Sequence, residues 1–426
     1  MRVVHINKSD QSGGAAVAAS RITAALREMD VAASLLVGEK RSTHPWVVPA
    51  VETGFQRGRL FINFLQEVAA FLPHEKSRSG RFAYSAGRKG LNLASHPLVQ
   101  QADVIHLHWF NQGYMSLKGL GQLLALGKPV VWTLHDMWSF TGGCHYAGNC
   151  AGYRLQCGTC PLIQDPGVDD ISARQFKRKQ AIYSTGPLAL VACSHWLAGV
   201  ASEAALLQGH AVSSIPNPIE TSVFRPLPRD VARERLGLDK ERKILLFGAA
   251  NVADPRKGMA LLWHALRHLA AKRGSDGIQL VVFGKAPEGL AKELPFPVKV
   301  LNYVSSTETL VDLYNAADVF VLPSLEDNLP NTVMEALACG TPVAAFRIGG
   351  VPEMVAHGIC GYLASAGDAG GLAEGIDFLL YKSRAETLRL NAREKVVQNF
   401  SPRTVAGQYL KLYEHLLQEK TYVQNR

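Results

Sequence analysis

The stretch Arg2-Val-Val-His-Ile-Asn7 decides the fold class of the first half of the chain, because it is a short apolar run that predicts a buried strand. A helical segment from Ala15 to Met29 follows it, and Ala33-Ser-Leu-Leu-Val37 predicts a second strand. Short buried strands that alternate with helices are typical of a parallel sheet covered on both faces. The N-terminal half therefore predicts a doubly wound α/β domain.

The same alternation continues through the rest of the chain. The proline-rich stretch around Ser214 to Pro218 disfavours helix and predicts a linker between two similar halves. Further strands are predicted at 103–107, 129–134 and 188–192 before it, and at 243–247, 278–283, 298–301, 318–322 and 342–346 after it. We therefore expect an N-terminal domain, a C-terminal domain, and a final helix with its tail, over 1–215, 216–400 and 401–426.

The composition supports two domains and narrows the class of partner. A chain of 426 residues exceeds the size at which single hydrophobic cores stop growing, and 47% hydrophobic with 19% charged residues excludes a disordered chain. The formal charge of +9 favours anionic partners such as nucleotides, nucleic acids or lipid headgroups. No run approaches the roughly 18 apolar residues of a membrane span, and a strand at residues 2–7 leaves no room for a signal peptide. We therefore expect a cytoplasmic protein.

Two loops that follow predicted strands have the composition of anion-binding sites. Gly13 and Gly14 precede the first helix, where glycine lets a ligand approach backbone N–H groups closely; a flexible turn is the alternative. In the second half, the strand ending at Phe247 leads to Arg256 and Lys257. These cations could neutralise a diphosphate leaving group, and a solvated surface pair is the alternative.

The most informative segment spans residues 323–340, where a polar loop follows a buried strand and a helix begins near residue 331. Carboxylates of the loop and of the helix would flank one helix N-terminus. This arrangement suits a nucleotide sugar, because acids can hold sugar hydroxyls and the ribose diol while backbone amides hold phosphate. The alternative is a pair of exposed acids that stabilises the helix dipole. The residues expected to bind the donor are Glu326, Asp327, Asn328, Leu329, Asn331, Thr332 and Glu335.

On these residues the chain resembles the retaining glycosyltransferases of the large family 4, whose donor motif is two glutamates separated by seven residues and followed by Gly-Thr-Pro. Glu335 matches the second glutamate, whereas the first position falls on Asp327, with Glu326 beside it. The resemblance gives Asp327 and Glu335 roles in catalysis at the donor sugar. Ala249 stands where the family has an arginine, so Arg256 is the candidate substitute.

The resemblance covers nearly the whole chain, because Gly13-Gly14, Lys257-Gly258 and Gly349-Gly350-Val-Pro-Glu353 also match the family. It implies the GT-B fold, in which two Rossmann-like domains face one another across a cleft and the final helix crosses back to the first domain. It also implies sugar transfer with retention from a nucleoside diphosphate sugar, with no cofactor required for catalysis. The stretch at 141–146 is similar to that of bacterial transferases of the exopolysaccharide, O-antigen and colanic-acid type.

Histidines stand at the ends of two predicted strands. His135 matches the family's cleft histidine, which lies near the donor sugar and the reaction centre, and Asp136 could orient either the acceptor hydroxyl or His135. His106, His108 and Asn111 form a second strand-end cluster. This cluster could line the acceptor pocket, and a packed core edge is the equally good alternative.

Four of the seven cysteines fall in one short insertion over residues 142–162, which has little apolar content to hold it together. Four thiolates could bind structural zinc there. The spacing after the first cysteine departs from paired zinc knuckles, so disulfides and free thiols remain alternatives. The residues are Cys144, Cys150, Cys157 and Cys160.

The segment from Arg59 to Leu72 is strongly apolar and has a basic flank. Such a flank suits an anionic membrane surface, whereas a core helix followed by a solvated loop is the alternative. Because acceptors in the resembling family are commonly lipid-linked, we expect peripheral contact with the inner face of the plasma membrane. The basic residues are Arg57, Lys76, Arg78, Arg81, Arg88 and Lys89.

The expected function is therefore transfer of a sugar to a hydroxyl of a growing, lipid-linked glycan in bacterial surface polysaccharide biosynthesis. A nucleotide-sugar epimerase on the same scaffold is one alternative. A non-catalytic basic protein that binds nucleic acid is another, but it gives no reason for Asp327 and Glu335. The sequence shows no aromatic-basic recognition motif, so we expect no nucleic-acid partner.

Overall fold

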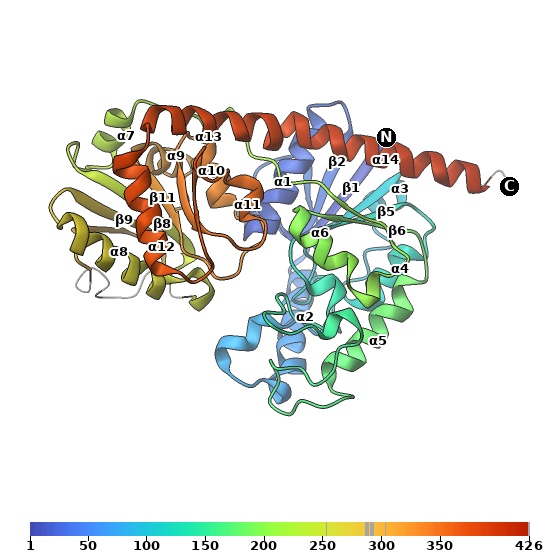
Figure 1. Ribbon diagram of the computed structural model, residues 1–426. Helices are drawn as coiled ribbons and strands as arrows, with labels where there is room; N and C mark the ends of the chain where they lie inside the picture. The colour runs from blue at the N-terminus through green and yellow to red at the C-terminus, as the bar shows by residue number, and fades with distance from the viewer. Residues whose placement is uncertain (253, 286–288, 290–293, 303, 425–426) are drawn as a thin grey trace. The chain divides into compact units, whose positions relative to one another are not determined.

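The computed structural model describes residues 1–252, 254–285, 289, 294–302 and 304–424, and the chain divides into two compact units (Figure 1). Unit 1 comprises Met1–Asn217 together with Val405–Arg426. Unit 2 comprises Pro218–Thr404. Each unit contains one parallel sheet with helices packed on both of its faces.

The sheet of unit 1 has the strand order β3-β2-β1-β4-β5-β6-β7, and the paired strands are parallel. Five of these strands lie where the sequence predicts them. The edge strands β3 and β7 were not predicted, because each is three residues long and mostly half-buried or exposed, which leaves little apolar signal. The strands are β1 (Arg2–Ser9), β2 (Ala32–Glu39), β3 (Val47–Pro49), β4 (Val104–Leu107), β5 (Val130–Leu134), β6 (Leu188–Ala192) and β7 (Val212–Ser214).

Alternate residues of the unit 1 strands face two different helix layers. Val3, Val104 and Val131 belong to the core under α1 and α14, whereas the residues that follow them along each strand contribute to the core on the opposite face. Helix α14 begins in unit 2 and packs its buried residues, including Tyr409 and Tyr413, on the unit 1 sheet. The helices are α1 (Gly14–Arg27), α2 (Gly54–Phe71), α3 (Pro97–Gln101), α4 (Leu117–Leu124), α5 (Ile171–Tyr183), α6 (His195–Ser202) and α14 (Pro402–Gln424).

The sheet of unit 2 has the order β10-β9-β8-β11-β12-β13 and is also parallel. Its described strands are β8 (Lys243–Asn251), β9 (Ile278–Lys285), β10 (Val298–Leu301), β11 (Val319–Leu322), β12 (Val343–Phe346) and β13 (Gly361–Ala364). Its helices are α7 (Arg229–Arg235), α8 (Met259–Arg273), α9 (Thr307–Ala316), α10 (Asn331–Ala338), α11 (Val351–Met354), α12 (Ala369–Asp377) and α13 (Ala385–Phe400).

The strand order of each sheet reverses at its middle, between β1 and β4 in unit 1 and between β8 and β11 in unit 2. In open parallel sheets, ligands bind outside the carboxyl ends of the strands at such a switch point. The loops after β1 and β4 contain Gly13 and His108, and the loops after β8 and β11 contain Lys257 and Asp327. The topology therefore brings most of the predicted site residues to the carboxyl edges of the two sheets.

Candidate functional site

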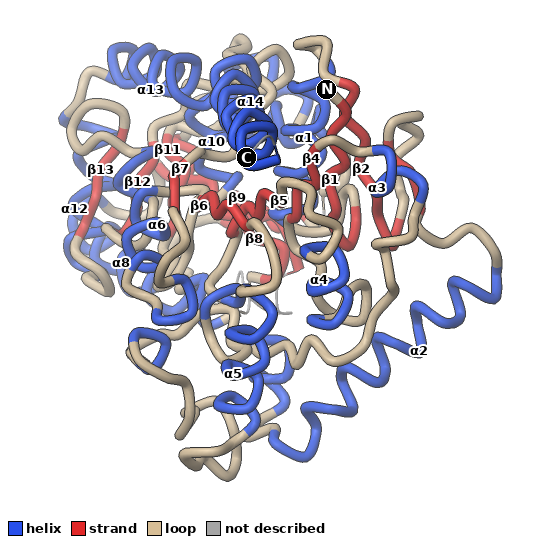
Figure 2. The backbone as a smooth tube through the Cα atoms, turned by 90° about the vertical axis from the view of Figure 1, so that its right-hand side faces the viewer, coloured by secondary structure: helices blue, strands red, loops and turns tan. Residues whose placement is uncertain are grey.

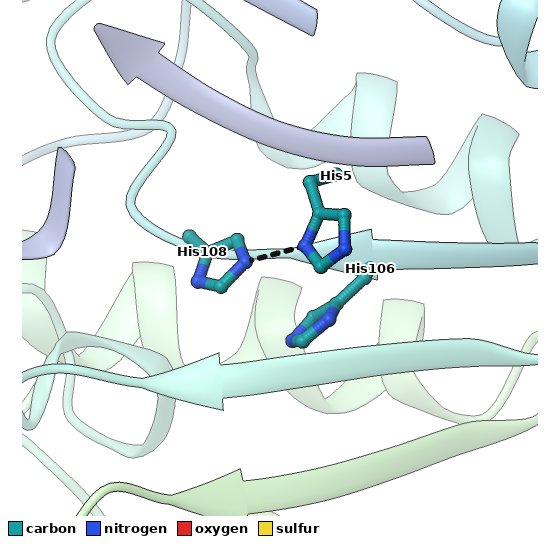
Figure 3. Close-up of side chains that lie close together, drawn as sticks. All are labelled: His5, His106 and His108. Atoms are coloured by element: carbon teal, nitrogen blue, oxygen red, sulfur yellow. Dashed lines mark hydrogen bonds between the residues drawn. The ribbon is translucent and has the colours of Figure 1, made fainter. Parts of the chain in front are cut away.

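A chain of buried histidines crosses the carboxyl half of the unit 1 sheet. His5 on β1 lies opposite His106 on β4, and Figure 3 shows both beside His108. His5 Nδ1 lies 3.0 Å from His108 Nε2, and His108 Nδ1 lies 3.1 Å from His135 Nε2. The predicted cleft histidine, His135, is therefore held by His108, which is held in turn by His5.

Burial keeps these imidazoles neutral. It lowers the pKa of His5 to about 3 and that of His135 to about 4, and it holds the pKa of His108 well below its ordinary value. Each neutral ring has one N–H, so each N···N contact holds one proton. If His108 donates to His135, then His5 donates to His108 from Nδ1. In that arrangement His5 Nε2 carries no proton. In the opposite arrangement His5 Nε2 carries a proton.

The far end of the chain selects between these two arrangements. His5 Nε2 is buried and has no hydrogen-bond partner among the described residues. A buried N–H without an acceptor costs more than an unused lone pair, because a donor without an acceptor forfeits its hydrogen bond outright. We therefore assign the chain the direction His5 to His108 to His135, which leaves the proton of His135 on Nδ1.

His106 lies deeper in the fold than an acceptor-pocket residue would. Its side chain is fully buried, its Nδ1 lies 2.6 Å from the Tyr413 hydroxyl, and its Nε2 lies 2.7 Å from Thr133 Oγ1. Tyr409 contacts the same threonine hydroxyl at 2.9 Å. Of the two alternatives left open by the sequence, the structure places His106 in the core under α14.

Asp136 is held by three donors at the end of β5. Its Oδ2 accepts from Trp109 Nε1 at 3.0 Å and contacts His145 Nδ1 at 2.7 Å, and its Oδ1 accepts from the Trp138 amide at 2.8 Å. Burial acts to raise the pKa of Asp136, but these partners outweigh it and the pKa lies below its ordinary value. Asp136 is thus a carboxylate fixed beside His135.

A water-sized cavity of about 10 Å³ lies against this group, lined by His108, Asn111, His135 and Asp136 among others. Asn111 is buried, and its Oδ1 has no partner among the described residues. Gly13 caps α1 with a φ of 91°, which favours glycine, and an added Cβ there would meet nothing within 4 Å. The structure thus brings Asn111, His108, His135 and Asp136 together and leaves the loop at Gly13 open to solvent.

His5, His106 and His108 are also the one group of three or more candidate metal ligands found among the described residues, with nitrogen atoms within 4.8 Å of one another. A metal ion would have to displace existing contacts, because both ring nitrogens of His106 and of His108 already have partners. The His106 and His108 rings also stack at 26°, so their in-plane lone pairs do not converge on one point. The group therefore fits a hydrogen-bond network better than a metal site.

In unit 2, three loops meet at the carboxyl edge of the sheet around Asp327. Its Oδ2 accepts from Lys257 Nζ at 2.6 Å. Gly258 follows with a φ of 68°, and a Cβ added there would lie 1.8 Å from the Pro323 carbonyl oxygen. Gly349 approaches the Asp327 carbonyl oxygen as closely, at 1.9 Å from an added Cβ. Glycine at both positions lets the loops after β8, β11 and β12 pack together by their backbones.

Glu335 lies on α10 and is buried, with its Oε2 accepting a hydrogen bond from the Tyr314 hydroxyl at 2.9 Å. The helix begins at Asn331, as predicted, and its N-cap residue Pro330 supplies no side-chain acceptor. The loop before it is compact, since Asn328 and Leu329 are buried whereas Glu326 and Thr332 are half-buried. The amides that open α10 thus lie in the same segment as the Asp327 and Glu335 carboxylates.

Arg256 makes a local contact within the loop after β8. Its guanidinium donates to Asp254 at 2.7 Å, and its side chain is 48% exposed. The Arg256 carbonyl oxygen accepts from the Leu325 amide at 2.8 Å, which fixes the loop after β8 to the loop after β11. Lys257 lies against one of the predicted donor carboxylates, Asp327.

All seven cysteines lie in the described part of the chain and are free thiols. Burial raises the pKa of Cys144 to about 12 and that of Cys157 to about 11, which keeps these thiols protonated. Tetrahedral zinc needs sulfur atoms about 3.8 Å apart, given Zn–S bonds of about 2.3 Å. No three of the described cysteine sulfurs lie even within 4.8 Å of one another. As placed, the thiols do not fit a zinc site, and the zinc expected from the sequence would require the loop to rearrange.

Sequence reasoning missed several partners that define these groups. His5 was taken only as part of the first strand. Because it comes two residues after Val3, it lies on the same face of the sheet as Val3 and the later histidines. Trp109, His145 and Tyr314 were not selected either. Their roles arise from contacts across the fold, and no local pattern in the sequence indicates which polar atom each would reach.

Comparison with known proteins agrees with this geometry. Residues 241–382 match the family described as Glycosyl transferases group 1. The matched segment contains the loops at Lys257 and Asp327 and helix α10 with Glu335. The match to this family thus covers about a third of the chain and lies within unit 2.

The curated relatives are sugar transferases that match part of the chain. D-inositol 3-phosphate glycosyltransferase of Thermobispora bispora is 32% identical over 38% of this chain and 42% of its own length. The protein of the same name from Mycolicibacterium smegmatis is 33% identical over 41% of each chain. The present chain therefore spans about two fifths of the length of these relatives.

Solved structures match the whole fold. Sucrose-phosphate synthase from Thermosynechococcus elongatus aligns with a TM-score of 0.66 and 20% identity over 98% of this chain and all of that one. Anabaena HepE in complex with UDP aligns with a TM-score of 0.62 and 17% identity over 97% of this chain and 100% of that one. The glycosyltransferase WaaG, involved in lipopolysaccharide biosynthesis, aligns with a TM-score of 0.60 and 16% identity over 96% of this chain and 99% of that one. At these identities the likeness concerns the fold, and the predicted GT-B class with two parallel sheets is confirmed.

Proposed function

We propose that this protein transfers a sugar from a nucleoside diphosphate sugar to a hydroxyl group of a glycan, with retention at the anomeric carbon. The observation that carries the proposal is the contact between Lys257 and Asp327 at the switch point of the unit 2 sheet, in the segment that also contains Glu335 and matches group 1 glycosyltransferases. Neighbours of the same fold were solved with UDP and with UDP-glucose, which supports a nucleotide-sugar donor.

Departure of the diphosphate is the step that unit 2 would assist. Negative charge grows on the leaving phosphate as the glycosidic bond breaks, and a fixed cation with helix N-terminal amides stabilises it. Lys257 would exchange its contact with Asp327 for the phosphate, which frees the Asp327 carboxylate for sugar hydroxyls. Glu335, already oriented by Tyr314, would hold the ribose diol.

Unit 1 would handle the acceptor and the reacting sugar. His135 would donate a hydrogen bond from Nδ1 to a sugar hydroxyl, because its Nε2 is occupied by His108. Asp136 would keep the neighbouring loop in place through Trp109 and His145. Attack on the same face as the departing diphosphate would give retention without a protein nucleophile, and this route needs no cofactor.

The biological setting belongs to the same proposal. We infer that the acceptor is a lipid-linked glycan of a bacterial surface polysaccharide, met at the inner face of the plasma membrane. Within the described residues, no helix has the length and apolar character that crossing a membrane requires. Support for membrane contact comes instead from exposed apolar side chains on α2, such as Phe55 and Phe61.

A thermal-shift screen of nucleoside diphosphate sugars tests the donor site. We expect one nucleotide family to raise the melting temperature, since a ligand at 100 times its Kd adds about 2.7 kcal/mol. Glu335→Ala should abolish the shift, whereas Glu374→Ala, an exposed carboxylate on α12, should keep it. A full shift in Glu335→Ala would remove Glu335 from the donor site, and the absence of a shift with every donor would contradict the proposed function. With an active donor, the anomeric proton of the product read by NMR reports retention or inversion.

A further inference from the structure

Helix α2 has its polar and apolar faces reversed relative to an ordinary surface helix. Its buried residues are Asn63, Glu67 and Phe71, and Glu67 accepts a hydrogen bond from the Lys89 amide. Its exposed residues include Phe55 at 83% and Phe61 at 60% exposure. Figure 2 shows α2 as a long helix at the periphery of unit 1. Apolar side chains in this number on one exposed face indicate a site for an apolar partner.

A groove of about 1000 Å³ lies between α2 and the carboxyl ends of β2 and β3. One wall is apolar and consists of Leu60, Phe61 and Phe64 of α2, with Phe82 and Val51 beside them. This volume lies at the upper end of the range of small-molecule sites.

Four cations also line the groove, and we call them its cationic wall. Lys8, Lys40 and Arg41 come from the ends of β1 and β2, and Arg57 comes from α2 itself. With one acid, Glu39, four positive charges and one negative charge leave a net +3. Such an excess of positive charge beside an apolar wall complements a molecule with an anionic head and an apolar chain.

Two of these cations are placed by contacts inside unit 1. Lys8 donates to Gln112 Oε1 at 2.7 Å and lies 5.2 Å from the centre of the Phe64 ring. The Asp10 carboxylate accepts from the Arg41 amide at 2.9 Å, which fixes the turn that follows β2. The Lys8 side chain is therefore held in place, whereas for Arg41 the contact fixes the backbone, and its guanidinium lies 3.6 Å from Glu39.

The groove is also connected to the residues beside the proposed reaction site. The Lys8 amide donates to the Trp109 carbonyl oxygen at 2.8 Å, and Trp109 Nε1 donates to Asp136 at 3.0 Å. Trp109 thus links the backbone of Lys8, whose side chain lines the groove, to the carboxylate that adjoins His135. Both the groove and His135 lie at the carboxyl edge of the same sheet.

We propose that this groove binds the phosphate-bearing end of an amphiphilic acceptor, with its phosphate or diphosphate at the cationic wall and the start of its apolar chain along Phe61 and Phe64. The sugar on that phosphate would then lie at the carboxyl edge of the unit 1 sheet, the edge that also carries Asp136 and His135. The inference rests on the proposed function and deepens it, because it names the acceptor class and the surface of unit 1 that selects it.

Calorimetric titration of the whole protein with farnesyl phosphate tests the groove, with farnesol and inorganic phosphate as the two halves of the probe. We expect saturable binding of farnesyl phosphate at concentrations where neither half binds. The double variant Lys40→Glu, Arg57→Glu changes the net charge of the groove from +3 to −1 and should weaken binding at least about tenfold. Phe61→Ser, at an exposed position, should also weaken it several-fold.

Two matched controls separate the groove from general charge and from adsorption to membranes. Lys118→Glu reverses an exposed charge on α4, and Phe55→Ser removes an exposed ring of α2 that does not line the groove. Both should bind farnesyl phosphate as the wild type does. Flotation with phosphatidylglycerol vesicles measures adsorption of the protein to membranes. Equal losses of farnesyl phosphate binding in Phe55→Ser and Phe61→Ser would contradict the proposal, because they would show that the exposed face of α2 adsorbs the probe without selection by the groove.

Donor binding is measured on the same samples, so that the two proposals fail separately. Wild-type affinity for farnesyl phosphate in the double variant would overturn the proposal that the groove binds the acceptor. UDP binding that persists in that case would leave the proposed donor site intact. Binding of inorganic phosphate as tight as that of farnesyl phosphate would also overturn the groove, because the apolar wall would then contribute nothing.

Discussion

His5 is the residue that decides where the proton of His135 lies. It touches neither a sugar nor a phosphate in the proposed reaction, and it acts through His108 because its own Nε2 has no acceptor among the described residues. Asp136 is likewise positioned by its neighbours. Trp109, His145 and Trp138 occupy some of its carboxylate lone pairs and so determine which of them are left for a substrate. The residues proposed to meet substrate are thus positioned by neighbours that a motif search does not select.

The buried histidines make stability fall in mild acid. Burial lowers the pKa of His5 to about 3, so below its ordinary value of 6.5 the unfolded chain binds a proton that the folded chain does not. The contribution of His5 to the free energy of unfolding is therefore fully present above pH 6.5 and is lost as the pH falls toward 3. For His5→Phe we expect a smaller loss between pH 6.5 and 5, by up to about 1.4 kcal/mol per pH unit. Urea denaturation at several pH values measures it, and His415→Phe, an exposed histidine, is the control. Parallel curves for wild type and His5→Phe would contradict this account.

Among the elements, α5 carries a buried cation next to the cysteine-rich loop. Lys179 is fully buried, donates to the Thr141 carbonyl oxygen at 2.9 Å and to the Trp138 carbonyl oxygen, and lies 3.7 Å from the centre of the Trp138 ring. Burial lowers its pKa to about 7, although Cys144 and Cys157 act to raise it. The helix thus ties the loop after β5 to the core through a lysine, in place of an apolar side chain.

This lysine should make stability rise with pH above neutrality. Between pH 7 and 10 the unfolded chain keeps the proton on Lys179 and the folded chain loses it, so the free energy of unfolding increases with pH. Lys179→Met should remove up to about 1.4 kcal/mol per pH unit of that increase between pH 7 and 9. Chemical denaturation at pH 7, 8 and 9 gives the slope. Lys177→Met, on an exposed position of the same helix, should leave it unchanged, and an unchanged slope in Lys179→Met would refute the assignment.

The cysteine-rich loop makes a prediction of its own about metal. Protonated thiols that do not converge should leave the purified protein with less than about a tenth of an equivalent of zinc. Elemental analysis of protein prepared without chelator measures this directly. About one equivalent, lost in Cys157→Ser, would show instead that the loop rearranges around zinc as the sequence first suggested.

At the scale of the molecule, the fold was predictable because each long strand carries its own signal. Leu188–Ala192 and Val319–Leu322 are continuous apolar runs between helices, and their burial on both faces follows from that pattern alone. The three-residue edge strands β3 and β7 were not predicted, because the sequence of a short, half-buried strand resembles that of a loop. In the candidate site, the carboxylates of the donor loop were found from their motif. The Lys257–Asp327 contact and the histidine chain depend on strand order, which no local pattern reports.

The final helix gives a prediction for the whole chain. Val405, Ala406, Tyr409 and Tyr413 are fully buried against the unit 1 sheet, and deleting one large aromatic side chain from a core costs about 3–5 kcal/mol. A chain that ends at residue 401 should therefore lose the cooperative unfolding transition of unit 1 and retain that of unit 2. Differential scanning calorimetry distinguishes the two, with a chain ending at residue 418 as the control. Two intact transitions in the shorter chain would contradict the role assigned to α14.

The path of α14 also bears on how the chain can be synthesised and dissected. The last buried tyrosine of unit 1 is Tyr413, so a ribosome completes this unit only after it has made all of unit 2. In the nascent first half, α1 alone covers this face of the sheet, and the apolar surface that α14 will cover is exposed, which favours binding by chaperones during translation. Anyone who wishes to study the first half in isolation must therefore fuse or add back the closing helix, because no single cut between the halves releases a finished piece.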